Sequence, residues 1–343
     1  MHGASPANPL VLLKDIVMQN DFANAKSTNA KMIPVIDISG AISGDGLDGV
    51  ADAIYNAAIN HGFFYISNHG IDPVLMEQAF AVSKAFFELP EVDKQAVAVD
   101  RNQRGWLAQG MSRLKGSKTH DLKEVFFWGP HTEADDMDVR ACKPLCAVNQ
   151  WPRDFPRLYE DLTPYYEAVC QMARHVMAAV AVSLDQPANF FDKAYAKPLA
   201  RGQMVYYPAS MLQDDSEVRF GVAPHTDFGV LTVLLQDSSG GLQVRANSGD
   251  WIEAPPIPGT LVCNIGDLLA RWSNNRFTST IHRVINRTSH ARYSIPVFFD
   301  PSTDTVIDPV DLGVSTDNSL FEPVCTGEYI MGRNTRSFAQ YKK

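Results

Sequence analysis

The sequence predicts an α+β fold in which helices of the first half support an all-β jelly roll in the second half. Two features of the chain predict it. Up to about residue 200, apolar residues recur mainly at the spacing of amphipathic helices. From Gln203 onward, short β-prone runs are separated at regular intervals by Gly, Pro, Asn and Asp, a pattern typical of a sandwich or barrel.

The bulk composition is that of an ordinary globular protein. The chain has 343 residues, a formal net charge of −9, 45% hydrophobic and 20% charged residues, which allows one large or two ordinary domains. The acidic balance argues against nucleic acid or a membrane surface as a partner. Five scattered cysteines do not resemble a disulfide framework, and no apolar stretch reaches the roughly 18 residues of a membrane span. We therefore expect a cytoplasmic protein with a small-molecule substrate, and the sequence leaves its oligomeric state open.

The first half contains the expected supporting helices. Residues 1–32 lack periodicity and are expected to form an arm, with a short helix near residues 10–17. After the arm, apolar spacing and helix-end signals define two strand–helix units. These are a strand at 33–37, a helix from Leu47 to a Gly62 C-cap, a buried strand at 63–66, and a helix from the Asp72 cap to Pro90.

A long amphipathic helix follows a polar stretch of loops and short strands at about residues 100–150. Its apolar stripe runs from Leu158 to Leu184. Pro164 interrupts the pattern, because proline lacks the N–H and its ring clashes with the preceding turn. Either the helix kinks there, or its regular part begins there with Thr163 as the cap.

The second half contains only short predicted strands. Each is bounded by turn-forming residues, as expected for a jelly roll. The expected strands are 204–207, 230–235, 242–245, 251–254, 261–265, 280–285 and 293–299.

Three residues of this half have the composition of a metal site. His225 and Asp227 are one residue apart, and His282 lies further along the chain. On an extended strand, side chains at i and i+2 point to the same face, so the first two could bind one ion. Two imidazoles and one carboxylate leave half of an octahedral iron open, as non-haem Fe(II) oxygenases require. Singly, each has a structural alternative: Asp227 could cap a loop, and His282 could be an ordinary packed histidine.

Arg292 and Ser294 are also one residue apart, and together they could hold a carboxylate. An arginine fork forms charge-assisted, bidentate hydrogen bonds with such a group. A 2-oxo acid held there could take two open positions on the iron, and O2 could take the third. Tyr207 could direct its hydroxyl at this acid or pack in the core. Arg292 alone could equally be a surface charge or part of a structural ion pair.

Short segments along the chain match, in the same order, the sequence pattern of one known family. In the first half they are Ile33–Asp37, Gly62–Phe64, Asn68–Gly70, Phe86–Pro90, Asp121–Glu124 and Asn149–Pro152. In the second half they are Tyr206–Pro208, Pro224–Asp227, Gly229, Asn264–Asp267, Thr280–Val284, Arg292–Ser294 and Gly327–Tyr329. Over about residues 33–335 the chain resembles the isopenicillin N synthase-like family of 2-oxoglutarate/Fe(II)-dependent dioxygenases.

The resemblance implies a double-stranded β-helix (jelly roll) core with flanking N-terminal and buttressing α-helices. Its implied parts are an arm at 1–32, an N-terminal dioxygenase module at 33–152, a helical segment at 153–200, the catalytic jelly roll at 201–302 and a C-terminal extension at 303–343. It implies Fe(II) on His225, Asp227 and His282. It also implies 2-oxoglutarate on Arg292 and Ser294, with Tyr207 near its other end, O2 as cosubstrate and ascorbate as reductant.

The implied reaction converts 2-oxoglutarate into succinate and CO2 while a small organic substrate is oxidised, most commonly by hydroxylation. Chain position alone suggests Phe228, Trp128, Arg113 and Phe298 as walls of the substrate pocket, although core packing is the favoured interpretation for Phe298. The fold does not specify the substrate.

Two other functions remain open at this stage. The first is a 2-oxoglutarate-independent Fe(II) oxidase of the isopenicillin N synthase type, in which Arg292 and Ser294 would hold the substrate's own carboxylate. The second is a non-catalytic jelly-roll module that binds a ligand. The complete set of metal-binding residue types argues against the second.

Overall fold

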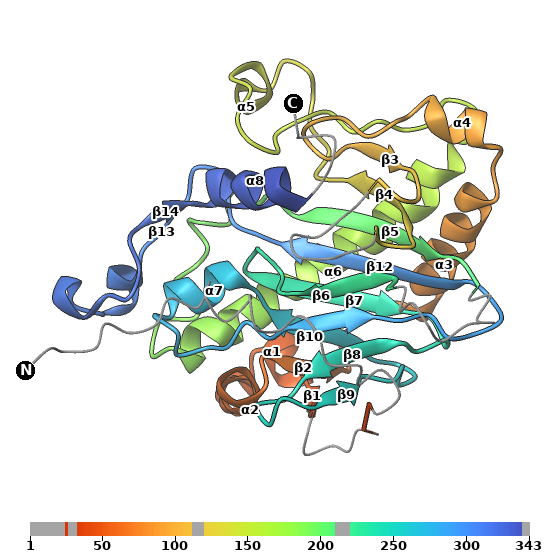
Figure 1. The fold of residues 1–343 in the computed structure, drawn as a ribbon. Coiled ribbons are helices and arrows are strands. Elements are labelled where there is room, and N and C mark those ends of the chain that lie inside the picture. Colours follow the sequence, from red (N-terminus) through yellow and green to blue (C-terminus); the bar gives the residue numbers. More distant parts are fainter. Residues whose placement is uncertain (1–24, 27–32, 112–119, 210–219, 338–343) are drawn as a thin grey trace, which may run out of the picture.

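The computed structural model describes residues 25–26, 33–111, 120–209 and 220–337. It shows a jelly roll made of two facing sheets, with helices on the outer face of the larger one (Figure 1). The predicted fold class is confirmed. The predicted helix near residues 10–17 lies outside the described residues.

The larger sheet has eight strands in the order β1-β2-β10-β7-β12-β5-β4-β3. Only β1 and β2 pair in parallel within it. The strands are β1 Val35–Asp37, β2 Phe63–Ser67, β3 Gly105–Leu107, β4 Glu124–Trp128, β5 Arg201–Tyr207, β7 Leu231–Gln236, β10 Leu261–Ile265 and β12 Arg292–Phe299.

The smaller sheet has four strands in the order β6-β11-β8-β9, and all its pairs are antiparallel. They are β6 Val222–His225, β8 Leu242–Arg245, β9 Trp251–Glu253 and β11 His282–Val284. A separate two-stranded antiparallel sheet is formed by β13 Val306–Ile307 and β14 Val324–Cys325.

The structure also contains eight helices in the described residues, and the three longest of them contact strands of the larger sheet from outside (Figure 1). In chain order the eight helices are α1 Ser39–Ser43, α2 Leu47–Asn60, α3 Pro73–Phe87, α4 Glu91–Gln95, α5 Met137–Arg140, α6 Arg157–Ser183, α7 Asp267–Trp272 and α8 Thr326–Ser337, with 3-10 turns η1 Pro309–Leu312 and η2 Thr316–Asn318. The predicted cap of α3 is present, since the Asp72 side chain accepts a hydrogen bond from the Val74 amide. Gly62 follows α2 with a positive φ, as a helix end requires.

The long helix α6 runs through Pro164 without ending. It begins at Arg157, so the alternative in which the regular helix starts at Pro164 is wrong. Its apolar stripe continues on both sides of the proline, with Leu158, Leu162 and Val169 fully buried. Burial of this face against α2 and α3 offsets the backbone hydrogen bond that the proline removes.

Strand alternation divides the interior into two packed layers. On β12, Ile295, Val297 and Phe299 face the helices, and on β5 so does Met204. A second apolar cluster lies between the two sheets and includes Tyr207. The alternate β12 residues, among them Arg292 and Ser294, therefore point into the space between the sheets. This space holds the candidate site.

All seven strands predicted for the second half are present, with bounds that differ by a few residues at most. The strands β6, β13 and β14 were not predicted, and β13 and β14 have only two residues each. The reason for β6 lies in its sequence. This strand is short, contains Pro224 and ends at a histidine, so it lacks the apolar run that marked the predicted strands.

Candidate metal centre

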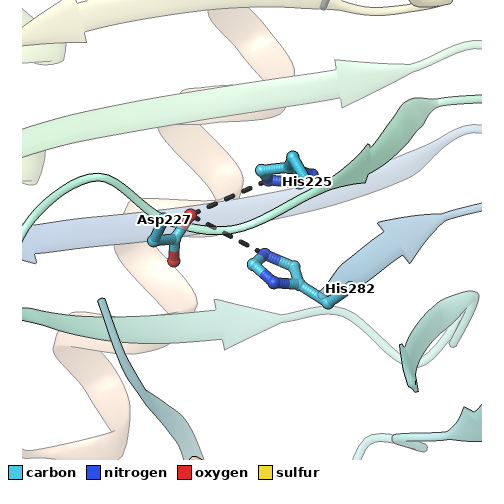
Figure 2. A group of neighbouring side chains, drawn as sticks. All are labelled: His225, Asp227 and His282. Carbon is cyan, nitrogen blue, oxygen red and sulfur yellow. Dashed lines mark ion pairs between the residues drawn. The ribbon is translucent and has the colours of Figure 1, made fainter. Parts of the chain in front are cut away.

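Three side chains from three segments converge between the sheets (Figure 2). His225 is the last residue of β6, Asp227 lies in the turn that follows, and His282 is the first residue of β11. One ligand atom from each lies within 4.8 Å of the other two. Each histidine Nε2 is 3.7 Å from Asp227 Oδ1. The structure thus brings together the three predicted metal ligands.

The prediction that His225 and Asp227 lie on one strand is wrong. Because β6 ends at His225, Asp227 does not share its strand. The Asp227 carbonyl accepts a hydrogen bond of 2.7 Å from the Asp267 amide, which fixes the turn. His282 joins the cluster because it lies directly opposite His225 in the antiparallel β6–β11 ladder.

Backbone carbonyls fix the orientation of both imidazoles. His225 Nδ1 lies 2.8 Å from the Ala223 carbonyl, and His282 Nδ1 lies 3.2 Å from the Thr280 carbonyl. A carbonyl only accepts, so each Nδ1 carries the hydrogen and each Nε2 presents a lone pair to the cluster. The Phe63 ring packs edge-on against His282 with 5.1 Å between ring centres.

Electrostatics favours the neutral imidazole and the ionised carboxylate. Burial, together with the neighbouring His282, lowers the pKa of His225 from 6.5 to about 3. Burial alone raises the pKa of Asp227, but the two histidines and hydrogen bonds from Thr232 and Asn264 outweigh it, so the pKa is lowered.

Two buried polar side chains orient the Asp227 carboxylate. Thr232 Oγ1 donates to Asp227 Oδ2 at 2.6 Å, and Asn264 Nδ2 donates to the same oxygen at 2.7 Å. The other oxygen, Oδ1, is left facing the two histidines. Sequence reasoning did not assign Thr232 or Asn264 to the site. The available signal was a polar residue inside an otherwise apolar strand, which is costly unless it has a partner.

This donor set fits a divalent iron. Lone pairs from two neutral imidazoles and one carboxylate oxygen converge with no hydrogen between them, which is favourable only around a cation. The three donor atoms lie within 4.8 Å of one another, so they could occupy three positions of one octahedral ion and leave the others open. Fe(II) bound there would activate O2 at those positions.

Arg292 lies in the same interior and is almost fully buried, with 1% of its surface exposed. Its Nε donates to the Gly240 carbonyl at 2.6 Å, and its Nη1 donates to Ser294 Oγ at 3.2 Å. The guanidinium stacks over the Tyr207 ring at 4.7 Å. Its Nη2 has no hydrogen-bond partner among the described residues. A buried cation in this state is suited to an anionic ligand.

The predicted pocket walls lie in different places. Phe298 is on the inner face of β12, opposite Thr232 in the ladder, with the Arg201 guanidinium 5.3 Å from its ring centre. Phe228 follows Asp227 and carries the Arg333 guanidinium over its ring at 4.6 Å. Arg113 lies outside the described residues.

Trp128 does not line the space between the sheets, so the prediction that it is a wall of the substrate pocket is wrong. It is 2% exposed and packs edge-on against Tyr166 of α6, with 6.0 Å between ring centres. On β4, Val125 and Phe127 face the space between the sheets, so Trp128 faces the helices instead. It therefore belongs to the core on the opposite side of the sheet from the candidate site.

Two family models match the chain, one in its first half and one in its second half. Residues 33–154 match the N-terminal region of the non-haem dioxygenases in morphine synthesis. Residues 202–301 match the 2OG-Fe(II) oxygenase superfamily. The chain belongs to the 2OG-Fe(II) oxygenase superfamily. It is a 2-oxoglutarate- and Fe(II)-dependent dioxygenase, so the predicted family, enzyme class and cofactors are confirmed.

Similar proteins span nearly the whole dioxygenase. The 2-oxoglutarate-Fe(II) type oxidoreductase hxnY of Emericella nidulans is 33% identical over 90% of this chain and 92% of its own. Homoarginine-6-hydroxylase 2-ODD-C23 of Glycine max is 32% identical over 91% of this chain and 99% of its own. A full-length Neurospora crassa protein, solved as a crystal structure in complex with alpha-KG, is 30% identical. Its TM-score is 0.79, and the match covers 89% of this chain and 97% of its own. Among the described residues, no helix is both long and apolar enough to cross a membrane.

Proposed function

We propose that this dioxygenase hydroxylates a small organic molecule on iron held by His225, Asp227 and His282. In the overall reaction one O2 is consumed. One oxygen atom enters a substrate C–H bond to give C–OH, and the other enters succinate as 2-oxoglutarate loses CO2. The observation that carries the proposal is the convergence of three metal-ligand lone pairs in the same interior as the buried Arg292, whose Nη2 has no partner among the described residues. The protein's residues would orient 2-oxoglutarate and the organic substrate and exclude bulk water from the reacting positions.

Arg292 and Ser294 are proposed to bind the distal carboxylate of 2-oxoglutarate. Both side chains are buried on the inner face of β12, and their mutual hydrogen bond aligns the two donors. Tyr207 lies opposite Arg292 on β5, and its ring supports the guanidinium. The distal carboxylate would satisfy the free Nη2 and leave the keto acid end directed at the metal.

The proposed substrate is a small molecule held near Phe298 and Phe228. Phe298 faces the site beside Thr232, and Phe228 adjoins the ligand Asp227. Solved relatives of this size hold small molecules: the full-length Neurospora crassa protein in complex with alpha-KG and thymine is 30% identical with a TM-score of 0.78. JOX2, solved with 2OG, Fe and JA, is 26% identical with a TM-score of 0.75. These similarities support a small molecule as the substrate but do not identify it.

Anaerobic titration of the purified protein with Fe(II) and then 2-oxoglutarate tests the site directly. We expect a visible metal-to-ligand charge-transfer band that requires both additions and is absent in His225→Ala. A metabolite screen for substrate-dependent succinate release then identifies the substrate. O2 consumption with substrate but without loss of 2-oxoglutarate would instead support the 2-oxoglutarate-independent oxidase. Absence of the band in the wild-type protein would contradict the proposed site.

A further inference from the structure

The turn that carries Asp227 is clamped between two parts of the fold. On one side, amides at the start of α7 donate to its carbonyls: Asp267 to Asp227 at 2.7 Å, and Leu268 to Gly229 at 2.9 Å. On the other side, the Asp300 carboxylate accepts a hydrogen bond of 2.8 Å from the Val230 amide through Oδ1. The metal-binding turn is therefore positioned by a buried carboxylate as well as by backbone.

Asp300 packs so closely against the turn that no additional atom fits between them. A Cβ placed on Gly229 would overlap the Asp300 carboxylate, and one placed on Gly266 would overlap the Gly229 carbonyl. Asp300 has no exposed surface, at 0%. A shift of this carboxylate would consequently shift the turn and the ligand that it carries.

Asp300 is in turn held by a buried arginine. Arg201 Nη2 donates to Asp300 Oδ2 at 2.8 Å, and Arg201 Nη1 donates to Gln103 Oε1 at 3.0 Å. Gln103 comes from the N-terminal module, Arg201 from β5 and Asp300 from the end of β12. The same guanidinium stacks on Phe298, a proposed wall of the substrate pocket.

We propose that Asp300 and Arg201 are positioning residues for the metal site, which act through the Val230 amide on Asp227. The inference rests on the proposed metal site. Groups that orient metal ligands typically change metal affinity when removed, even though they never touch the ion. A buried carboxylate also needs its cation, so loss of Arg201 should disturb Asp300.

The test is the affinity of the full-length protein for Co(II), a probe ion that is stable in air, measured by calorimetry and by its visible absorption without turnover. For Asp300→Ala we expect roughly 10- to 100-fold weaker binding. Asp300→Asn retains an acceptor for Val230 and should lose less. Arg201→Met, which retains the Asp300 acceptor, is the second test if Asp300→Ala does not fold.

Glu124→Ala provides a matched control. Glu124, on β4 of the same sheet, pairs with Lys94 of α4 at 2.8 Å, and 15% and 8% of the two side chains are exposed. Its carboxylate accepts hydrogen bonds from Lys94 and Trp106 rather than from the metal turn. The substitution should lower the melting temperature without changing Co(II) affinity. Wild-type affinity in folded Asp300→Ala, or in Arg201→Met where Asp300→Ala does not fold, would overturn the positioning role. An equal loss of affinity in Glu124→Ala would overturn it as well. Failure of the wild-type protein to bind Co(II) would instead contradict the metal site itself.

Discussion

At the scale of single residues, the site combines groups whose ionisation is set by burial and by one another. Backbone carbonyls accept hydrogen bonds from Nδ1 of His225 and of His282, which leaves both Nε2 atoms directed at Asp227. Asp227 directs one oxygen at the histidines because Thr232 and Asn264 occupy the other. Hydrogen bonds within the protein therefore orient all three side chains of the site.

Replacing Arg292 by Met should weaken 2-oxoglutarate binding. The substitution removes the proposed charge-assisted hydrogen bonds to the distal carboxylate of 2-oxoglutarate. Such bonds contribute about 1.5–3 kcal/mol, or roughly 10- to 100-fold in Kd. Anaerobic titration of the metal-loaded protein with 2-oxoglutarate measures the effect. Metal affinity should stay unchanged, and Arg276→Met, at an exposed arginine paired with Asp185, should bind 2-oxoglutarate normally. Unaltered 2-oxoglutarate affinity in Arg292→Met would remove this residue from the cosubstrate site.

The metal-free protein should lose stability as the pH falls from 7 to 5. The unfolded chain protonates His225 near its ordinary pKa of 6.5, whereas the folded chain resists protonation down to about pH 3. Between these values the unfolded state binds more protons, so acidification favours unfolding, by as much as about 2 kcal/mol at pH 5. The lowered pKa of Asp227 acts in the same direction at lower pH.

Urea unfolding of metal-free protein at pH 7 and pH 5 checks this dependence. His225→Asn retains a polar side chain but has no group that titrates in this range. We expect the variant to lose less stability between the two pH values. An identical loss in both proteins would show that other groups set the acid sensitivity.

At the scale of elements, two antiparallel ladders bring the functional residues together. The β6–β11 ladder places His225 opposite His282, and the β5–β12 ladder places Tyr207 opposite Arg292. Successive side chains of a strand point to opposite faces of the sheet, so the strand's position decides which residues reach the site. On β4 this alternation points Trp128 toward the helices. A shift of the strand by one residue would point it toward the space between the sheets.

The helix α6 offers a test of how tertiary packing overrides local preference. Pro164 is exposed and lies inside the helix, where proline is about 3 kcal/mol less favourable than alanine. Pro164→Ala should therefore raise the free energy of unfolding, by about 1–3 kcal/mol once the greater freedom of the unfolded chain is included. Urea denaturation measures the change. A loss of stability would instead show that the buried stripe of α6 requires the geometry that the proline imposes.

At the scale of the whole molecule, the site depends on parts that are distant in the sequence. The proposed metal ligands come from two strands and a turn of the jelly roll. Gln103, which precedes β3, is linked to that turn through Arg201 and Asp300. The helices α2, α3 and α6 support the sheet from outside and contribute none of the proposed ligands (Figure 1). Metal binding should therefore stabilise the fold as one unit.

Fe(II) at about 100 times its Kd should stabilise the folded protein by about 2.7 kcal/mol, because the unfolded chain lacks the assembled site. Anaerobic thermal unfolding with and without Fe(II) measures the shift. Addition of 2-oxoglutarate should raise the melting temperature further only when metal is present. In Asp227→Ala, Fe(II) and 2-oxoglutarate should raise the melting temperature less than in the wild-type protein. An equal rise in that variant would show that the ion binds elsewhere.

The sequence alone determined the features that depend on residue type and local period. Helical spacing predicted α2, α3 and α6, and short runs between turn residues predicted seven of the strands. The motif residues His225, Asp227 and His282 were identifiable because few residue types bind iron in this combination.

Only the tertiary structure decided how these residues meet. A turn places Asp227 beside the two histidines, and Thr232 and Asn264 orient its carboxylate. Asp300 holds the same turn through the Val230 amide. All these contacts join segments that are distant in the sequence, so local patterns do not predict them. The outward face of Trp128 depends on strand register, which a single sequence specifies weakly. Periodicity is a local property of the chain, whereas the convergence of lone pairs on one point is fixed by the packing of the two sheets.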